Sequence, residues 1–209
     1  RRRAEASATP RAPAHRVPAG ESPVILAAVC HVNGSREVTN EDLIARLPGW
    51  TSSDIVQRTG IERRYWIGPG ENALTLAVAA CRKLFETLQI SIADVDAIIC
   101  STGTPLSTTP SLACRILREL SQPHNSAEIQ AHDINAACTG YLYALQQTWD
   151  LLQIRPDAKV LLVTSETLSP MLDPSDPNTL FLFGDAATAS LISGSPFRGQ
   201  MNLRVHRPV

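Results

Sequence analysis

A cysteine stands where a short apolar run gives way to a helical pattern. The stretch HDINAACTGYLYALQQTWDLLQ runs from His132 to Gln153, and Cys138 follows two alanines within it. The first N–H groups of a helix lack partners inside the helix, and with the helix dipole they favour a thiolate placed there. We therefore expect Cys138 to be a nucleophile on a sharp strand-to-helix turn. The alternative is a buried structural cysteine, because free cysteine is among the most buried residue types.

Small residues surround this cysteine and would let a substrate reach its sulfur. They are Ala136, Ala137, Thr139 and Gly140. A bulky side chain at these positions would block the approach. The residue types thus favour covalent chemistry at Cys138. A single cysteine without these neighbours would be only weak evidence for a catalytic nucleophile.

The other cysteines are widely spaced along the chain. They are Cys30, Cys81, Cys100 and Cys114, and no C-x-x-C pair occurs. Neither a zinc site nor a disulfide framework is indicated, and we expect no metal and no cofactor. These four cysteines sit in apolar or helical contexts and are expected to be buried. A reducing cytoplasm is the simplest setting. A redox-sensing role for Cys138 lacks a nearby resolving cysteine.

The histidines offer no obvious base for the thiol. They are His15, His31, His124, His132 and His206. His132 is the nearest in sequence, but it lies on the preceding strand beside Asp133, and neighbouring strand residues point to opposite faces. Because a base must lie within hydrogen-bond reach, we do not expect His132 to contact Cys138.

Strands alternate with helices along the whole chain. Expected strands cover residues 24–30, 95–102, 127–134, 158–166 and 179–193, the last with a glycine-acidic turn at Gly184-Asp185 inside it. Expected helices cover residues 38–47, 51–61, 71–88, 110–120 and 138–152. Thr39 or Asn40 can cap the first helix, and Pro110 is expected near the first turn of the fourth. This alternation predicts an α/β layered domain with parallel crossovers.

Composition excludes some classes of function. The chain has 209 residues, of which 44% are hydrophobic and 19% charged, and its formal net charge is −1. Such a chain can bury a core, and neither nucleic acid nor an anionic membrane is expected as a main partner. Its apolar runs are far shorter than the roughly 18 residues of a membrane span. We expect residues 1–22, rich in Arg, Ala and Pro, to be a flexible tail or linker, and residues 23–209 to form the folded part.

Three blocks of the sequence together resemble a known family. They are TSSDIVQRTGIERRYW, DINAACTGYLYAL and SETLSPMLDPSDPNTLFLFGDAATASLI. In this order they resemble the N-terminal half of β-ketoacyl-acyl-carrier-protein synthase III, one of the thiolase-fold condensing enzymes, from about Val24 to Ile192. The resemblance implies a thiolase-like αβαβα layered fold, of which this chain supplies mainly the first half.

The resemblance also implies roles for individual residues. In the family the cysteine of the A-C-x-G block attacks an acyl thioester, and here that residue is Cys138. Thr109 stands where well-known members have a phenylalanine that closes the acyl pocket across the dimer, which implies room for a longer or branched acyl chain unless another residue fills the space. The substrate-binding positions implied by the resemblance are Arg58, Thr59, Thr109, Leu168, Phe183 and Gly184.

Two departures from the family bear on what the chain can do alone. The family's H-Q-A-N and G-N-T-S blocks, which supply a catalytic histidine and asparagine, do not occur here. These groups are therefore expected in a C-terminal half, carried by the same or another chain. In some members a tryptophan and an arginine clamp the adenine of coenzyme A. The corresponding positions here are Asp54 and Pro177, which cannot stack on a base. Trp50 or Trp66 could substitute, but each is expected to pack in the core.

These observations predict acyl transfer through a cysteine thioester. The favoured reaction is decarboxylative Claisen condensation of an acyl thioester with a malonyl thioester, in fatty-acid or polyketide-type biosynthesis. The alternatives are acyl transfer to an alcohol or amine, and a non-catalytic partner subunit, against which the retained cysteine argues. Loss of the adenine clamp favours a donor on acyl carrier protein without excluding coenzyme A. The resemblance further implies a homodimer.

Overall fold

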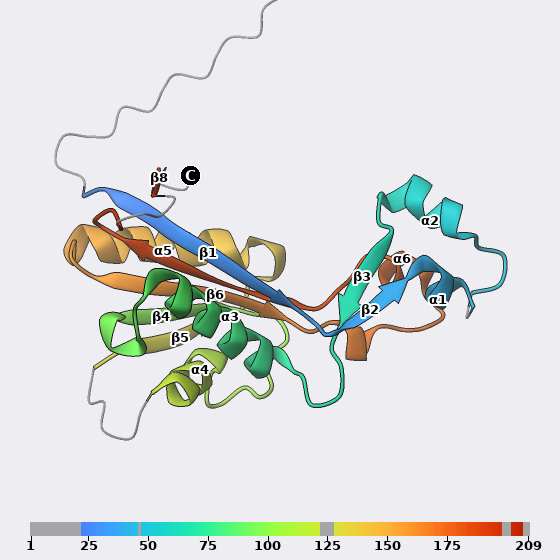
Figure 1. Ribbon diagram of the computed structural model, residues 1–209, viewed down its shortest axis with the longest axis horizontal. Helices are drawn as coiled ribbons and strands as arrows, with labels where there is room; N and C mark the ends of the chain where they lie inside the picture. The colour runs from blue at the N-terminus through green and yellow to red at the C-terminus, as the bar shows by residue number, and fades with distance from the viewer. Residues whose placement is uncertain (1–21, 46, 122–127, 198–201, 207–209) are drawn as a thin grey trace, which may run out of the picture.

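The fold is described from a computed structural model of the chain (Figure 1). The structure describes residues 22–45, 47–121, 128–197 and 202–206. The expected tail, His15 and His124 lie outside these ranges, apart from Ser22 at the end of the tail. Just before the first strand, the Ser22 N–H donates to the side chain of Gln153 at 2.9 Å.

A six-stranded mixed sheet forms the centre of the molecule, in the order β5-β4-β6-β7-β1-β8. Strands β4, β5 and β6 are parallel, whereas β7 runs antiparallel to both β6 and β1, and β8 antiparallel to β1. The strands are β1 Val24–Asn33, β4 Ala97–Ser101, β5 Gln130–Ile134, β6 Lys159–Glu166, β7 Ala186–Ser193 and β8 Leu203–Val205. All five residues of β4 are buried, as expected for a central strand covered on both faces.

Helices cover the two faces of this sheet, as Figure 1 shows. Helices α3 (Ala73–Leu88) and α4 (Leu112–Leu120) pack on one face, and α5 (Gly140–Ile154) packs on the other. Asn72 caps α3 by accepting the N–H groups of Leu74 and Thr75. The apolar side chains of α3 that face the sheet are buried, Cys81 and Leu84 completely. The predicted α/β layered architecture is therefore confirmed.

A second, smaller layer lies beyond one end of the sheet (Figure 1). Its two strands pair antiparallel, and a separate apolar cluster built around Ile55, Trp66 and Phe181 fills its interior. The elements of this layer are β2 Arg36–Thr39, α1 Asn40–Ile44, α2 Ser52–Thr59, β3 Arg63–Trp66 and α6 Pro177–Leu180. Sequence patterns did not predict this pair of strands, because each has only four residues and the two lie far apart in the chain.

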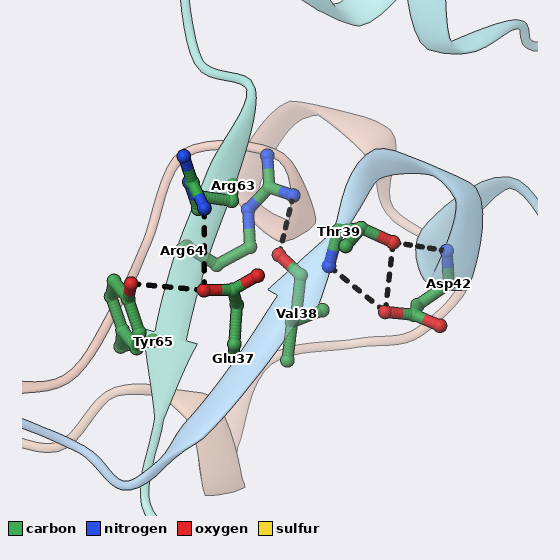
Figure 2. A network of polar contacts seen from close by, with 7 residues as sticks. All are labelled: Glu37, Val38, Thr39, Asp42, Arg63, Arg64 and Tyr65. Atoms are coloured by element: carbon green, nitrogen blue, oxygen red, sulfur yellow. Dashed lines mark hydrogen bonds and ion pairs between the residues drawn. The ribbon is translucent and has the colours of Figure 1, made fainter.

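Polar contacts fix the solvent side of the small layer, as Figure 2 shows. One oxygen of Glu37 accepts from the Tyr65 hydroxyl at 3.0 Å and from the Arg63 guanidinium at 3.5 Å. Thr39 caps α1 through a reciprocal pair of hydrogen bonds with Asp42. These exposed contacts hold β2 in register with β3 and start α1 directly after β2.

Two details of the sequence prediction were wrong. Residues 179–185 are not part of the last strand, because Asp176 caps a short helix that begins with Pro177, and β7 starts only at Ala186. Cys114 is exposed rather than buried. Pro110, by contrast, directly precedes the N-cap residue of α4, near its first turn as predicted. Among the helices of the described residues, none combines the length and apolar character that a bilayer crossing requires.

Candidate active site

Cys138 lies on the tight turn that joins β5 to α5. It is the middle residue of a 3-10 turn at Ala137–Thr139, and the preceding Ala137 has a φ of 45°, in the left-handed region that alanine rarely adopts. The Thr139 hydroxyl closes the turn by donating to the carbonyl of Ala136 at 2.8 Å. Cys138 is exposed, so the alternative of a buried structural cysteine is wrong. A constrained backbone that presents a side chain to solvent is typical of functional turns.

The start of α5 packs closely on the side chain of Ser101, the last residue of β4. A Cβ atom added to Gly140 would lie 2.2 Å from the Oγ of Ser101, so a larger residue there requires Ser101 or the start of α5 to move. No side chain caps the N-terminus of α5. The preceding turn instead takes up the N–H groups of Thr139 and Gly140, which donate to the carbonyls of Ala136 and Ala137.

Other predicted site residues leave the sheet at the same edge. Because β4, β5 and β6 are parallel, the segments that follow them all emerge where their carboxyl ends meet. These segments carry Thr109, Cys138 and Leu168 respectively. Thr109 is exposed and Leu168 is half-buried. Topology therefore brings three of the predicted residues to one side of the molecule.

The remaining predicted residues belong to the small layer. Arg58, in the last turn of α2, places its guanidinium 4.6 Å from the centre of the Trp50 ring, and that ring meets Phe181 edge-on at 4.9 Å. Thr59 ends α2 with its hydroxyl, which donates to the Ile55 carbonyl at 2.7 Å and accepts the Ile61 N–H at 3.0 Å. Arg58 is exposed and its guanidinium rests on the Trp50 ring, whereas the Thr59 hydroxyl is hydrogen-bonded to backbone groups of its own turn.

Strand β3 holds the segment that contains Phe183 and Gly184. The Trp66 indole N–H donates to the carbonyl of Phe183 at 3.0 Å, and the N–H of Asp185 donates to the carbonyl of Tyr65 at 2.7 Å. A Cβ on Gly184 would lie 3.1 Å from that same Tyr65 carbonyl oxygen. Gly184 therefore allows a close backbone approach, and the Phe183 side chain remains partly exposed, at 38%.

Asp185, the residue after Gly184, connects three segments of the chain. Its buried carboxylate accepts the N–H groups of Ile67 at 2.7 Å and of Ser169 at 2.9 Å, together with the Ser169 hydroxyl. Its carbonyl accepts the N–H of Gly34 at 2.9 Å. The aspartate of the F-G-D block thus joins the end of β1, the end of β3 and the segment after Leu168.

Arg64 is a buried cation that sequence reasoning missed. Its guanidinium donates to the carbonyls of Val38 and Phe181 and to the side chain of Asn40, at 3.3, 3.0 and 2.8 Å. Burial lowers the pKa of Arg64 below its usual value, because desolvation disfavours the charged form. No local motif marks this residue, since its partners are distant in sequence.

In the part of the chain that the structure describes, no base is hydrogen-bonded to the Cys138 thiol. His132 Nε2 lies 2.9 Å from the Gln147 side-chain oxygen on α5. Asp133 points to the other face, where its carboxylate accepts the N–H groups of Leu112 and Ala113 at the start of α4. The predicted opposite orientation of the two side chains is confirmed. Within the described ranges, no hydrogen bond joins Cys138 Sγ to another side chain.

The buried cysteines differ from Cys138 in their chemistry. Burial raises the pKa of the Cys81 thiol to about 12 and that of Cys100 well above its usual value, since an apolar interior disfavours a thiolate. Cys30 is also buried, whereas Cys114 is exposed and contacts the carbonyl of Ala131 at 3.6 Å. Only Cys114 and Cys138 are therefore open to reagents in solution.

Comparison with known proteins places this arrangement in a family. The family model for 3-oxoacyl-[acyl-carrier-protein (ACP)] synthase III matches residues 132–206. The chain is 39% identical over 150 residues to the beta-ketoacyl-[acyl-carrier-protein] synthase III of Allorhizobium ampelinum, covering 71% of this chain and 45% of the relative. It is 34% identical over 172 residues to that of Nitratidesulfovibrio vulgaris, covering 82% and 51%.

Solved structures agree with the sequence relatives. The 3-oxoacyl-(acyl-carrier protein) synthase of Burkholderia xenovorans LB400 superposes with a TM-score of 0.77 at 32% identity, over 87% of this chain and 51% of that one. The priming β-ketosynthase of the R1128 polyketide pathway gives 0.75 at 31% identity, over 88% and 54%. The chain spans about half the length of the relatives it matches, and over that half it belongs to the β-ketoacyl-[acyl-carrier-protein] synthase III family of thiolase-fold enzymes.

Proposed function

We propose that this chain takes an acyl group onto Cys138 as the first half-reaction of a decarboxylative condensation. The observation that carries this proposal is the exposed sulfur on a constrained turn at the uncapped N-terminus of α5. An acyl acceptor needs a nucleophile that a thioester can reach, and the small residues on both sides of Cys138 leave its approach open.

The acylation step follows from this geometry. The thiolate of Cys138 attacks the thioester carbonyl carbon, which forms a carbon–sulfur bond and places negative charge on the carbonyl oxygen. The backbone N–H of Cys138 itself is suited to stabilise that oxyanion. Collapse of the intermediate breaks the original carbon–sulfur bond and releases the carrier as a thiolate, which takes up a proton. The Cys138 thioester remains.

In the second half-reaction we propose that a malonyl thioester loses carbon dioxide and its carbanion attacks the acyl carbon, expelling the Cys138 thiolate. The enolate formed by decarboxylation requires hydrogen-bond donors. His132 is engaged with Gln147, so we propose that a histidine and an asparagine outside this chain, in the same or another polypeptide, supply those donors. The half-length match to the relatives supports this division.

We propose that the exposed surface of Arg58 and Phe183 receives the carrier arm of the donor. Trp50 orients Arg58, and the guanidinium keeps donors free for a phosphate. Asp54 accepts hydrogen bonds from Thr51 at the start of α2, so it caps a helix and does not stack on a base. This arrangement supports a donor carried on acyl carrier protein.

We also propose that the molecule is completed by pairing with a second copy. Strand β5, which leads to Cys138, lies at the edge of the sheet, with β4 as its neighbour among the described strands. An unpaired edge is a template for a further strand. On the adjacent helix α5, Leu142 and Tyr143 are 54% and 56% exposed, which supports an apolar contact there.

Intact-mass spectrometry tests the proposed function. We expect incubation with acyl thioesters of acyl carrier protein to add one acyl mass, Cys138→Ala to abolish the addition, and Cys114→Ala to leave it unchanged. Cys114 is the matched control, because it is the other exposed thiol. Absence of loading with every donor, or loading that persists in Cys138→Ala, contradicts the proposal and favours a non-catalytic subunit.

A further inference from the structure

The chain crosses between the small layer and the six-stranded sheet at a joint formed by the ends of β1, β3 and β6 and the start of β7 (Figure 1). Ala186, the first residue of β7, pairs with Asn33 and Glu166, the last residues of β1 and β6. Since β6 is parallel to β4 and β4 to β5, this is also the end of the sheet at which β5 leads to Cys138. The joint therefore determines how the small layer lies relative to the nucleophile.

Asp185 forms the inner part of this joint. It is 1% exposed, and its carboxylate accepts the N–H groups of Ile67, directly after β3, and of Ser169, which follows β6. Its carbonyl accepts the N–H of Gly34, directly after β1. Because a buried polar group that loses its partner is strongly destabilising, these bonds resist separation of the segments that cross here.

Glu71 forms the outer part of the joint, in the segment between β3 and α3. Its Oε2 accepts the N–H of Gly68 at 2.7 Å and the N–H of Ser35 at 2.9 Å, which links the segments after β3 and β1 a second time. These two N–H groups lower the pKa of Glu71, so its carboxylate is ionised at neutral pH. Hydrogen bonds to an ionised carboxylate are about twice as strong as neutral ones.

Backbone contact leaves little space at the joint. A Cβ atom added to Gly34 would overlap the carbonyl of Trp66, the last residue of β3. The segments after β1 and β3 therefore lie directly against each other. A tilt of the small layer that separates these segments breaks hydrogen bonds of Asp185 and Glu71.

We propose that Asp185 and Glu71 are positioning residues that fix the small layer against the sheet and thereby favour donors with a long carrier arm. This inference rests on the proposed function. The small layer carries Arg58 and Phe183, and the sheet leads to Cys138, so the joint sets the distance that a donor arm must span. Binding energy from a remote surface helps a reaction only when it places the reacting carbonyl correctly. A short thioester that contacts Cys138 alone does not depend on that distance.

The test uses two variants of the joint and two matched controls in the purified protein. Glu71→Ala removes the acceptor, whereas Glu71→Gln keeps it, because a single oxygen of Glu71 accepts both N–H groups. Glu62→Ala removes another carboxylate of the small layer, from an exposed position. Asp185→Asn alters the inner part and is assayed well below its thermal midpoint.

The first readout is the loading rate of Cys138 from an acyl group on acyl carrier protein, divided by the rate from the same acyl group on N-acetylcysteamine. We expect Glu71→Ala and Asp185→Asn to lower this ratio about tenfold, within the roughly 100-fold that a misplacement of about 1 Å can cost. Glu71→Gln and Glu62→Ala should keep the ratio of the unaltered protein. A ratio that stays unchanged in either joint variant, or equal losses with both donors, overturns the proposal.

The second readout does not depend on acyl transfer. Double electron–electron resonance measures the distance between spin labels on Cys114 of α4 and on Gln57→Cys of α2, both exposed, in a Cys138→Ala background. The distance distribution should broaden in Glu71→Ala and Asp185→Asn and stay narrow in the controls, whereas an unchanged distribution contradicts the proposal. If the unaltered protein loads no acyl group from either donor, the proposed function fails, and the label distances alone decide whether the two carboxylates fix the small layer.

Discussion

The packing of Gly140 on Ser101 gives a sharp test of how α5 presents Cys138. In Gly140→Ala the new methyl group would lie 2.2 Å from Ser101 Oγ and 3.4 Å from Ser101 Cβ. The hydroxyl oxygen is therefore the atom that clashes, because 3.4 Å to Cβ is close to ordinary contact. Alanine can be accommodated only if Ser101 or the start of α5 moves.

Overpacking of a filled core costs about 1–3 kcal/mol, whereas alanine in a helix gains up to about 1 kcal/mol over glycine. We expect Gly140→Ala to lower the free energy of unfolding by about 1–2 kcal/mol, or the thermal midpoint by about 2–8 °C for a chain of this size. Alkylation of Cys138 by iodoacetamide should also change, because its turn shifts with the helix. Urea titration and peptide mapping measure the two effects.

Ser101→Ala supplies the matched rescue. Removing the hydroxyl deletes the clashing atom, so the double variant should recover to within about 1 kcal/mol of the unaltered protein, with a coupling energy of about 1–2 kcal/mol. Cys138 alkylation should recover with it. A fully stable Gly140→Ala variant, or a double variant no better than the single one, refutes the packing argument.

Three further predictions concern other parts of the account. Asp185→Asn keeps the shape but leaves a donor facing Ser169 or Ile67, so unfolding free energy should fall by about 2–4 kcal/mol in urea titration. The side-chain hydroxyl and N–H of Thr51 lower the pKa of Asp54, so this cap stabilises α2 above the unfolded pKa and is lost as pH falls through the lower folded value. The protection factors of amide exchange in residues 52–59, which correct for the intrinsic pH dependence of exchange, should therefore fall below about pH 4, and Asp54→Asn should remove that change. Thr109→Phe should exclude long acyl chains from Cys138 while acetyl loading persists, as intact mass would show.

Periodic segments of the sequence were sufficient to predict most of the large layer. The apolar spacing of residues 71–88 gave α3, and the continuous apolar run at β4 gave a strand buried on both faces, because each pattern records burial directly. Residues 179–185 were wrongly predicted as strand because the run TLFLF, residues 179–183, consists of residue types that are common in strands. Its helix starts from a cap at Asp176 and Pro177, and it is stabilised by contacts with the distant strand β3.

The features of the candidate site also fall into two groups: those that a local sequence pattern predicts, and those that depend on contacts between distant residues. Cys138 could be found from its place between a strand and a helix, since that signal is local. The buried Arg64 and the fit of Gly140 on Ser101 depend on pairs of residues 24 to 117 apart in sequence, and no local pattern encodes them. The small residues around Cys138 did indicate close packing, but not its partner.

Peptide mapping of the acylated protein tests the central claim most directly. After incubation with an acyl thioester donor, the acyl mass should lie on the peptide that contains Cys138, and neutral hydroxylamine should remove it, because a thioester is labile to that nucleophile. An acyl group found on Cys114 instead, or a Cys138 peptide that stays unmodified while donor thioester is consumed, would contradict the account.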